Sequence, residues 1–162
     1  MKIRPIKQPT SSACGPVCIQ LTAKYFGLDF SFTEITHITG YKPSEGLSNK
    51  DIVSGLRRLG LSVRGKKNAT WSDLRQLNTK KNIIVVSWML RGCIGHVSLI
   101  NKVAKNHIFL ADTEEGKILK LPKLVFLRQW MDYDDMWFPL KNTDIQLRWM
   151  AVVSKKRKGN DQ

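Results

Sequence analysis

Helix signals and strand signals occupy separate parts of this 162-residue sequence, and that separation constrains the fold more than any other feature. Residues 12–26 place apolar or thiol side chains on one helical face, and Gly27 then favours a helix stop. The segment 31–39 predicts a short second helix. From residue 83 onward, apolar runs bounded by turn residues predict strands. Helices that precede an antiparallel sheet are typical of the α+β class.

Two capping boxes predict two more helices in the first half of the chain. Ser48 and Asp51 form the first box, ahead of an apolar helical face that ends at Gly60. Thr70 and Asp73 form the second. Each box supplies hydrogen-bond partners for backbone groups that a helix leaves unpaired at its start, so both boxes predict where a helix begins.

The second half of the chain predicts a sheet. We expect the strands to be 83–90, 96–104, 107–111 and 117–121 as a meander, and 145–153 as a closing strand. A helix is expected near 123–131. The sequence contains no internal repeat and no interdomain linker, so we expect one domain over residues 1–153 and a basic disordered tail over 154–162.

Charge and targeting signals limit where the protein works and what it binds. Its 27 Lys and Arg residues against 13 Asp and Glu residues give a net charge of +14, which predicts an acidic partner such as nucleic acid, an anionic membrane face or an acidic peptide. The basic residues are scattered, so nucleic acid is not favoured.

The N-terminus lacks an apolar signal sequence and the longest apolar run, 83–90, is too short to span a bilayer. We therefore expect a cytoplasmic protein with no transmembrane segment and with reduced cysteines.

One cysteine lies where the first helix begins. In "QPTSSACGPVC", residues 8–18, Cys14 is followed at once by Gly15 and Pro16. The positive end of a helix dipole and a nearby imidazolium both lower the pKa of a thiol in that position. The resulting thiolate is a strong nucleophile, and it needs an imidazole to hold and return the proton.

Three other residues are the candidate partners of that thiol. His96 opens a strand in "CIGHVSLIN", and Asp112 ends the next strand, where a hairpin can bring its carboxylate beside the imidazole. The side-chain amide of Gln8, with the backbone N–H of Cys14, can donate hydrogen bonds to an oxyanion on the attacked carbonyl. The four residues together predict acyl transfer through a thioester, which needs neither a metal nor a cofactor.

The segments "QPTSSACGPVC", "GHVSLI" and "LADTEEG", in this order and spacing, resemble the bacterial C39-type cysteine peptidases. These are papain-like domains best known at the N-termini of exporters, where they cleave leader peptides after a Gly-Gly pair. The resemblance covers about residues 5–153 and also includes "EGLSNKDIVSGLRRLGLSVRG" and "LPKLVFLRQWM". It implies a papain-like fold with Cys14 as nucleophile, His96 as general base and acid, Asp112 as orienting carboxylate and Gln8 as oxyanion donor. It also implies a peptide substrate, with a double-glycine leader and a separate exporter as candidate partners.

Three features depart from the family pattern. Ala13 stands where the family often has an acidic residue, and Thr113 stands where proline commonly follows the aspartate. No membrane domain or ATPase follows the peptidase segment, which predicts a stand-alone domain. This last departure leaves the identity of the substrate open but does not alter the expected chemistry.

Several alternatives remain at this stage. The same four residues suit a papain-like amidase or transferase, and a degenerate site would leave a basic binding module for nucleic acid or an acidic partner. Cys14, Cys18, Cys93 and His96 could form a Cys₃His zinc site, although a strand places positions 93 and 96 on opposite faces. Cys14 could also be a buried small apolar residue. Cys18 is expected in the core, with a disulfide to Cys14 on oxidation as the other option.

Overall fold

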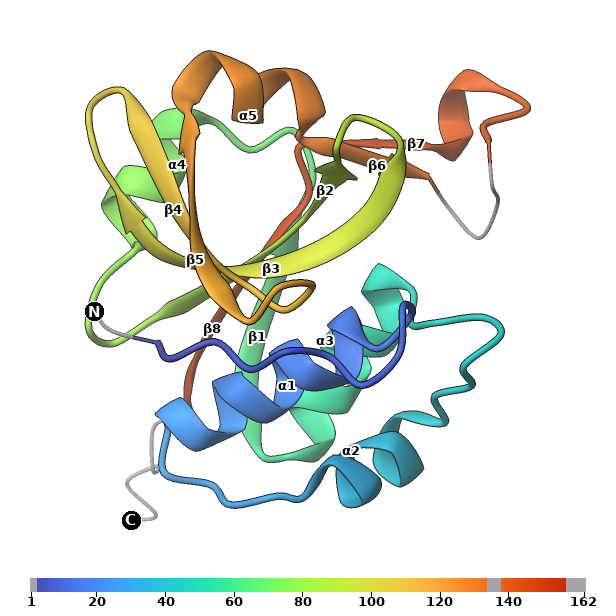
Figure 1. Cartoon of the computed structure of the whole chain (residues 1–162). Helices are drawn as coiled ribbons and strands as arrows, with labels where there is room; N and C mark the ends of the chain where they lie inside the picture. The colour runs from blue at the N-terminus through green and yellow to red at the C-terminus, as the bar shows by residue number, and fades with distance from the viewer. Residues whose placement is uncertain (1–2, 134–137, 157–162) are drawn as a thin grey trace, which may run out of the picture.

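The computed structural model describes residues 3–133 and 138–156. The element order within these residues is helical first and strand-rich later, as the sequence predicts (Figure 1). The α+β class is confirmed. The helices are α1 (Cys14–Tyr25), α2 (Phe32–Thr39), α3 (Asn49–Arg58), α4 (Trp71–Leu77) and α5 (Lys123–Gln129).

Local capping explains where three of these helices begin. Ser31, Ser48 and Thr70 each accept a hydrogen bond from the backbone three residues on, and each helix returns a carboxylate to the backbone of its cap. These reciprocal bonds are the capping boxes, and two of them are the boxes predicted from the sequence. Helix α1 differs, because its N-cap residue Ala13 has no side chain that can bond to the helix.

Six strands form one antiparallel sheet in the order β1-β8-β2-β3-β4-β5. Their bounds are β1 (Leu61–Lys66), β2 (Ile83–Leu90), β3 (Ile94–Val103), β4 (His107–Asp112), β5 (Lys117–Pro122) and β8 (Met150–Lys155). A separate two-stranded sheet pairs β6 (Met131–Tyr133) with β7 (Ile145–Leu147), which follows the short 3-10 helix η1 (Asn142–Asp144). The predicted meander β2–β5 is therefore present, and strand β1 at one edge is an addition.

The predicted closing strand is two strands in two different sheets. Arg148 lies between them with a φ of 49°, which turns the chain out of an extended conformation. Its backbone N–H donates to the carbonyl of Trp130 instead of to a neighbouring strand. Strand β8 then continues to Lys155, two residues into the segment expected to be a tail. Residues 157–162 of that expected tail lie outside the described residues.

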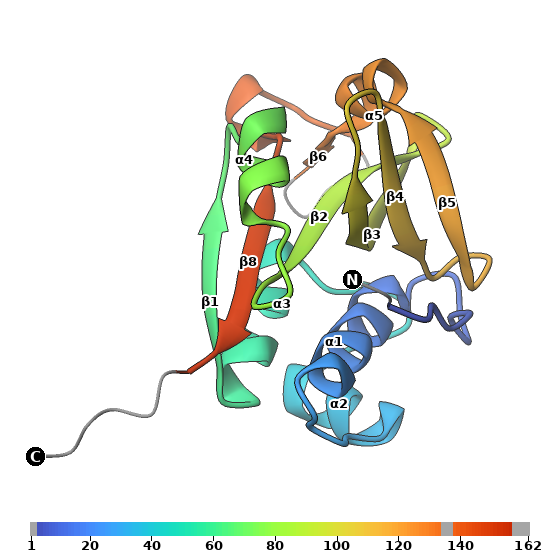
Figure 2. The ribbon, with the colours of Figure 1, turned by 90° about the vertical axis from the view of Figure 1, so that its left-hand side faces the viewer.

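The continuous apolar run of β2 is explained by burial on both faces of the sheet. All eight of its residues are buried. Ile83 and Val85 pack with α1, α2 and α3, whereas Ile84, Val86 and Trp88 pack with α4 and α5. Figures 1 and 2 show these two groups of helices in the lower and upper parts of the molecule, with the curved sheet between them. No helix among the described residues has both the length and the apolar character needed to cross a bilayer.

Candidate active site

The nucleophile candidate Cys14 is the first residue of α1, and its side chain is half-buried. The first N–H groups of any α-helix have no acceptor within the helix. Here the N-cap residue Ala13 offers no side-chain acceptor, and the first turn carries no acidic residue. The positive end of the helix dipole therefore lies at Cys14 without a protein carboxylate in that turn to offset it.

The residue after the cysteine lies close to another segment. A Cβ atom at Gly15 would lie 3.0 Å from the Cβ of Leu47, so a larger residue here would require Leu47 to shift by a few tenths of an ångström. The loop that carries Leu47 is also bonded to the segment before Cys14. The Tyr41 hydroxyl lies 2.7 Å from Ser12 Oγ and 2.8 Å from Thr10 Oγ1. These contacts hold the chain that leads into α1 in one position.

His96 and Asp112 come together across the β3–β4 ladder. Leu99 pairs with Ala111, and an irregularity in the register follows between Ile100 and Lys102. His96 Nε2 donates to Asp112 Oδ1 at 2.7 Å, and each of the two residues is only 3% exposed. The predicted pairing of imidazole and carboxylate is thus present in the structure.

Two further contacts fix this pair. The indole of Trp88, the cross-strand neighbour of His96 on β2, meets the imidazole edge-to-face at 5.9 Å between ring centroids. The backbone N–H of Glu115 donates to Asp112 Oδ2 at 3.2 Å. The carboxylate therefore has one oxygen for His96 and another for the turn after β4, which restricts its rotation.

The Cys14 side chain acts on the same imidazole, since it is one of the groups that raise the pKa of His96. Three side chains that lie far apart in the sequence therefore belong to one site, with His96 bonded to Asp112 and influenced by Cys14. This arrangement can hold a thiolate beside an imidazolium, with a carboxylate behind it.

The electrostatics of the pair favour its charged form. Burial opposes the imidazolium, but the hydrogen bonds and negative charges of Asp112 and Cys14 outweigh burial and raise the pKa of His96 from 6.5 to about 9. Burial likewise opposes the charge of Asp112, yet the hydrogen bond and charge of His96 keep the pKa of this carboxyl below its usual 3.8. At neutral pH the imidazole is therefore protonated and the carboxylate ionised.

Gln8 is buried near these residues, but its amide is already engaged. Its Nε2 donates to the carbonyl oxygen of Ser11 at 2.9 Å and to Glu114 Oε2 at 3.0 Å. Its Oε1 accepts a hydrogen bond of 2.8 Å from the hydroxyl of Thr113. The sequence predicts Gln8 as an oxyanion donor, and in this structure both of its amide hydrogens have other acceptors.

Thr113 and Glu114 are therefore two residues that belong to the site and were not predicted. In the sequence Thr113 is only a departure from a family proline, and in the structure it is fully buried against Gln8. Its backbone carbonyl also accepts the N–H of Gln8 at 2.7 Å. The available signal was this departure itself, since a buried threonine beside an expected glutamine can supply a hydroxyl where proline cannot.

The other two cysteines are arranged unlike ligands of a common metal. Cys18 is fully buried and its thiol donates to the carbonyl of Val97 at 3.4 Å, while Cys93 is exposed. Burial first, and then the negative charges of Cys14 and Asp112, raise the pKa of the Cys18 thiol well above 9. Across residues 3–133 and 138–156, no three Cys, His, Asp or Glu side chains come together as a metal would need. The Cys₃His arrangement considered from the sequence is therefore not formed by the described residues.

A cavity of about 590 Å³ lies elsewhere, beside α3. Its lining includes four basic residues and no acidic one, and it also contains the indole of Trp149. The basic residues are Lys50, Arg57, Arg58 and Lys67. The cavity does not include Cys14, His96 or Asp112, and its lining contains no cysteine and no histidine. The chemistry of the side chains, rather than the size of the cavity, therefore identifies the Cys14 cluster as the candidate active site.

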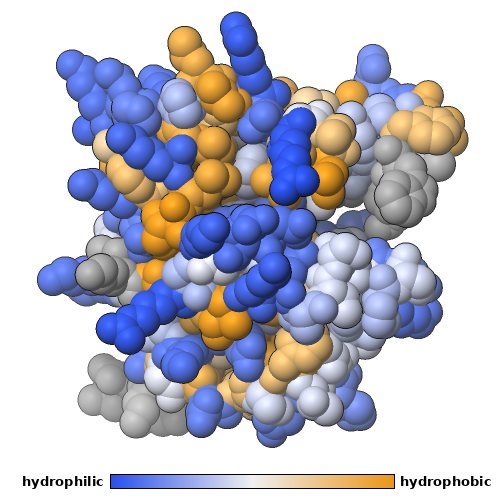
Figure 3. All heavy atoms as spheres, viewed as in Figure 1, coloured by the Kyte–Doolittle hydropathy of each residue, from blue (hydrophilic) through white to orange (hydrophobic). Residues whose placement is uncertain are grey.

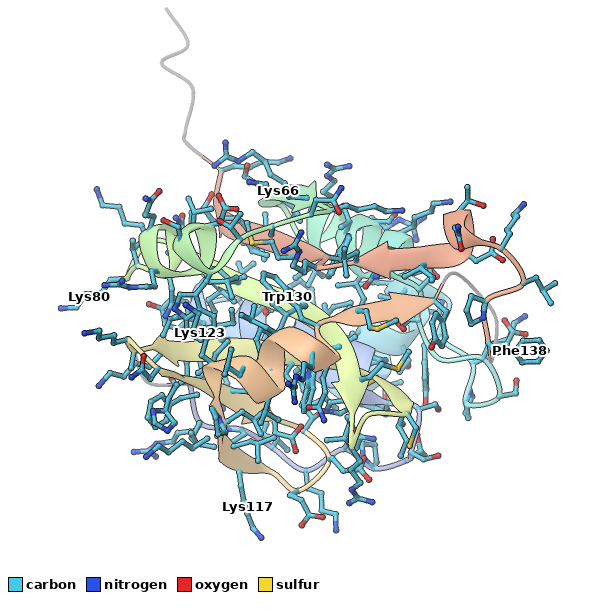
Figure 4. All side chains as sticks on the ribbon, turned by 90° about the horizontal axis from the view of Figure 1, so that it is seen from above. Lys66, Lys80, Lys117, Lys123, Trp130 and Phe138 are labelled. Carbon is cyan, nitrogen blue, oxygen red and sulfur yellow. The ribbon has the colours of Figure 1, made fainter. Side chains whose placement is uncertain are left out.

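Lysines project from more than one edge of the molecule. Figure 4 shows Lys66, Lys80 and Lys117 projecting from different edges of the molecule. Figure 3 shows apolar side chains among the charged ones around β5 and α5, where Ile118 and Leu124 are exposed.

Solved structures with the same fold are C39-type peptidase domains. The peptidase domain of Streptococcus ComA, a bifunctional ABC transporter, aligns over 96% of this chain and all of its own length, with a TM-score of 0.73 and 17% identity. A double-glycine-motif protease from an AMS/PCAT transporter, solved with its leader peptide, aligns over 95% of this chain and 93% of its own, with a TM-score of 0.71 and 16% identity. A putative C39-like peptidase from Bacillus anthracis gives a TM-score of 0.73 at 9% identity, over 97% of this chain and 96% of its own. The fold is thus that of papain-like cysteine peptidases.

The sequence itself shows the family. The model of the Peptidase C39 family matches residues 2–134, so the chain belongs to that family and is a cysteine-type peptidase, as predicted. A curated relative is the SPbeta prophage-derived sublancin-168-processing and transport ATP-binding protein SunT of Bacillus subtilis, 25% identical over 120 residues. The match covers 72% of this chain but only 16% of that relative, so this chain corresponds to a small part of it.

Proposed function

We propose that this peptidase cleaves a peptide bond through a thioester on Cys14, with His96, Asp112 and Gln8 in the roles that the family pattern implies. The observation that carries the proposal is the hydrogen bond between His96 and Asp112, together with the influence of Cys14 on the imidazole. A thiolate at a helix start beside a buried imidazolium is the arrangement that nucleophilic attack on a carbonyl needs.

The raised pKa of His96 defines the order of the proton transfers in this proposal. The imidazolium is already formed at neutral pH, so the Cys14 thiolate attacks the scissile carbonyl carbon directly. His96 then gives its proton to the leaving amine as the C–N bond breaks and the thioester remains. The neutral imidazole next accepts a proton from water, the water oxygen attacks the thioester, and release of the acid restores the imidazolium and the thiolate. Asp112 keeps its negative charge throughout.

We further propose that the substrate is a leader peptide with a Gly-Gly pair, cleaved on the cytoplasmic side before export by a separate exporter chain. Two relatives support this choice. One is described as processing and transporting sublancin 168, and the other as a double-glycine motif protease in complex with a leader peptide.

The test is incubation of the wild type and Cys14→Ala with matched peptides that do or do not carry Gly-Gly, followed by mass spectrometry. We expect the wild type to cut after Gly-Gly and Cys14→Ala to cut nothing. Cleavage of both peptides would contradict the proposed specificity and retain the peptidase. A mass change without chain cleavage would instead identify an amidase or transferase.

Alkylation by iodoacetamide at pH 6 tests the nucleophile separately from any substrate. We expect Cys14 to react faster than a free thiol, because the imidazolium of His96 favours the thiolate. A rate no greater than that of a free thiol would contradict the proposed role of Cys14 and favour a binding module.

A further inference from the structure

The side-chain amide of Gln8 is fully bonded in the free protein. An amide nitrogen carries two hydrogens, and here one is donated to Ser11 O and the other to Glu114 Oε2. Under the proposed function, the oxyanion requires one of these two hydrogens. Because Ser11 contributes a backbone carbonyl while Glu114 contributes a side chain, Glu114 is the acceptor that can leave without moving the chain.

The orientation of the Gln8 amide is determined by its neighbours. The carbonyl of Ser11 and the ionised carboxylate of Glu114 can only accept hydrogen bonds, so both must face the amide nitrogen. The hydroxyl of Thr113 can donate, and it lies 2.8 Å from Gln8 Oε1. Reversal of the amide would place an oxygen against two acceptors, so Nε2 faces Glu114.

The turn that carries Glu114 is packed tightly on the segment that carries Gln8. Gly116 has a φ of 66°, and a Cβ atom there would lie 2.8 Å from the backbone nitrogen of Lys7. The N–H of Gln8 donates to the carbonyl of Thr113 at 2.7 Å. The same turn donates the N–H of Glu115 to Asp112. The position of Glu114 is therefore linked to both the oxyanion donor and the orienting carboxylate.

We propose that Glu114 is a positioning residue that keeps Gln8 out of use until a substrate displaces its carboxylate. This inference rests on the proposed function of Gln8. A charged acceptor binds an amide hydrogen more strongly than a neutral one, and a carboxylate beside the developing oxyanion repels it. Both effects oppose the transition state. The Glu114 side chain is only partly buried, so water can solvate its carboxylate once it moves away.

The experiment compares Glu114→Ala and Glu114→Gln with the wild type on the peptide that the wild type cleaves best. With one amide hydrogen of Gln8 released, we expect Glu114→Ala to raise kcat/KM about fivefold, the size of one partly exposed charge-assisted hydrogen bond. Glu114→Gln keeps an acceptor but loses the charge, so its increase is expected to be smaller. Asp29→Ala is the matched control, since it removes an exposed carboxylate in the loop between α1 and α2.

Alkylation of Cys14 by iodoacetamide distinguishes positioning from a general change in structure. This reaction forms no oxyanion, so we expect its rate to be the same in the wild type and in both Glu114 variants. A kcat/KM of Glu114→Ala that is equal to or lower than that of the wild type would overturn the inference, as would a parallel change in the alkylation rate. A wild type that cleaves no peptide would contradict the proposed function, and this inference with it.

Discussion

The start of α1 and the β3–β4 ladder meet at the candidate site, and they hold their side chains in different ways. Cys14 is half-buried at a helix end whose N-cap residue contributes no side-chain bond. His96 and Asp112 are almost fully buried, between paired strands and against the Trp88 ring. The start of α1 therefore leaves the Cys14 sulfur partly exposed, and the β3–β4 ladder shields the proton on His96.

The two regions therefore control different properties, namely the exposure of Cys14 and the charge of His96. A nucleophile must be reached by its substrate, so some exposure of Cys14 is necessary. The charge state of His96 depends on the burial and partners that the sheet supplies, and these partners raise its pKa to about 9. The sheet thus sets the charge of His96, and the helix end presents the Cys14 sulfur to a substrate.

The largest expected effect comes from removal of the imidazole. His96→Ala should reduce kcat by about 10³-fold, because the leaving amine loses its proton donor and the thiolate loses its counter-charge. Peptide cleavage and iodoacetamide alkylation at pH 6 should both fall. His37→Ala, which changes an exposed histidine on α2, is the control and should keep both rates. Retained cleavage in His96→Ala would show that the two regions do not act together.

The sequence predicts elements that are specified by neighbouring residues better than contacts between distant segments. The capping boxes at Ser48 and Thr70 and the run 83–90 specify elements through residues that are neighbours in the chain, and these predictions are confirmed. The pairing of His96 with Asp112 spans 16 residues and one hairpin, so it was also within reach of sequence.

Contacts that join distant segments were harder to predict. Thr113 and Gln8 are 105 positions apart, and their bond depends on how two turns pack together. Strand β1 has a short apolar start followed by Arg64, Gly65 and Lys66, and all six of its residues pair with β8. The break at Arg148 depends on a single backbone angle that an apolar pattern does not encode.

A smaller loss is expected when the carboxylate is neutralised but its shape is kept. Asp112→Asn removes a charge and an acceptor that raise the pKa of His96, so this pKa should fall from about 9 toward 6.5. The alkaline limb of a plot of kcat/KM against pH should therefore move to lower pH. Turnover at pH 6 should fall at least tenfold less than in His96→Ala, since the imidazole remains. An unmoved alkaline limb would mean that Asp112 does not control the charge of His96.

The same pair should make stability depend on pH in a defined direction. The folded-state pKa of His96, about 9, lies above its ordinary 6.5, so its stabilising contribution is complete below pH 6.5 and is lost as the pH rises through 9. Asp112 has a lowered pKa, so its contribution is present above pH 3.8 and is lost as the pH falls further. From the size of the His96 shift, the alkaline loss is at most about 3 kcal/mol.

Urea unfolding at a series of pH values measures this dependence. The free energy of unfolding of the wild type should be highest between about pH 4 and 6.5, and the alkaline decline should be weaker in Asp112→Asn. If the free energy of unfolding declined equally at alkaline pH in the two proteins, the titrating group would lie elsewhere. The proton would then not be held by the His96–Asp112 pair.

The smallest effect is expected for the second cysteine of α1, which lies on the buried side of the boundary between the two regions. Cys18→Ala removes one sulfur atom from a fully buried position and should lower the free energy of unfolding by about 1 kcal/mol. The kcat should stay within a factor of two, because the Cys18 thiol bonds to Val97 O and not to His96.

In the native wild type, iodoacetamide should modify Cys14 and the exposed Cys93 and leave Cys18 intact, since burial raises the pKa of its thiol. Rapid alkylation of Cys18 would show that the start of α1 opens readily. The difference in burial between the start of α1 and the β3–β4 ladder would then not hold.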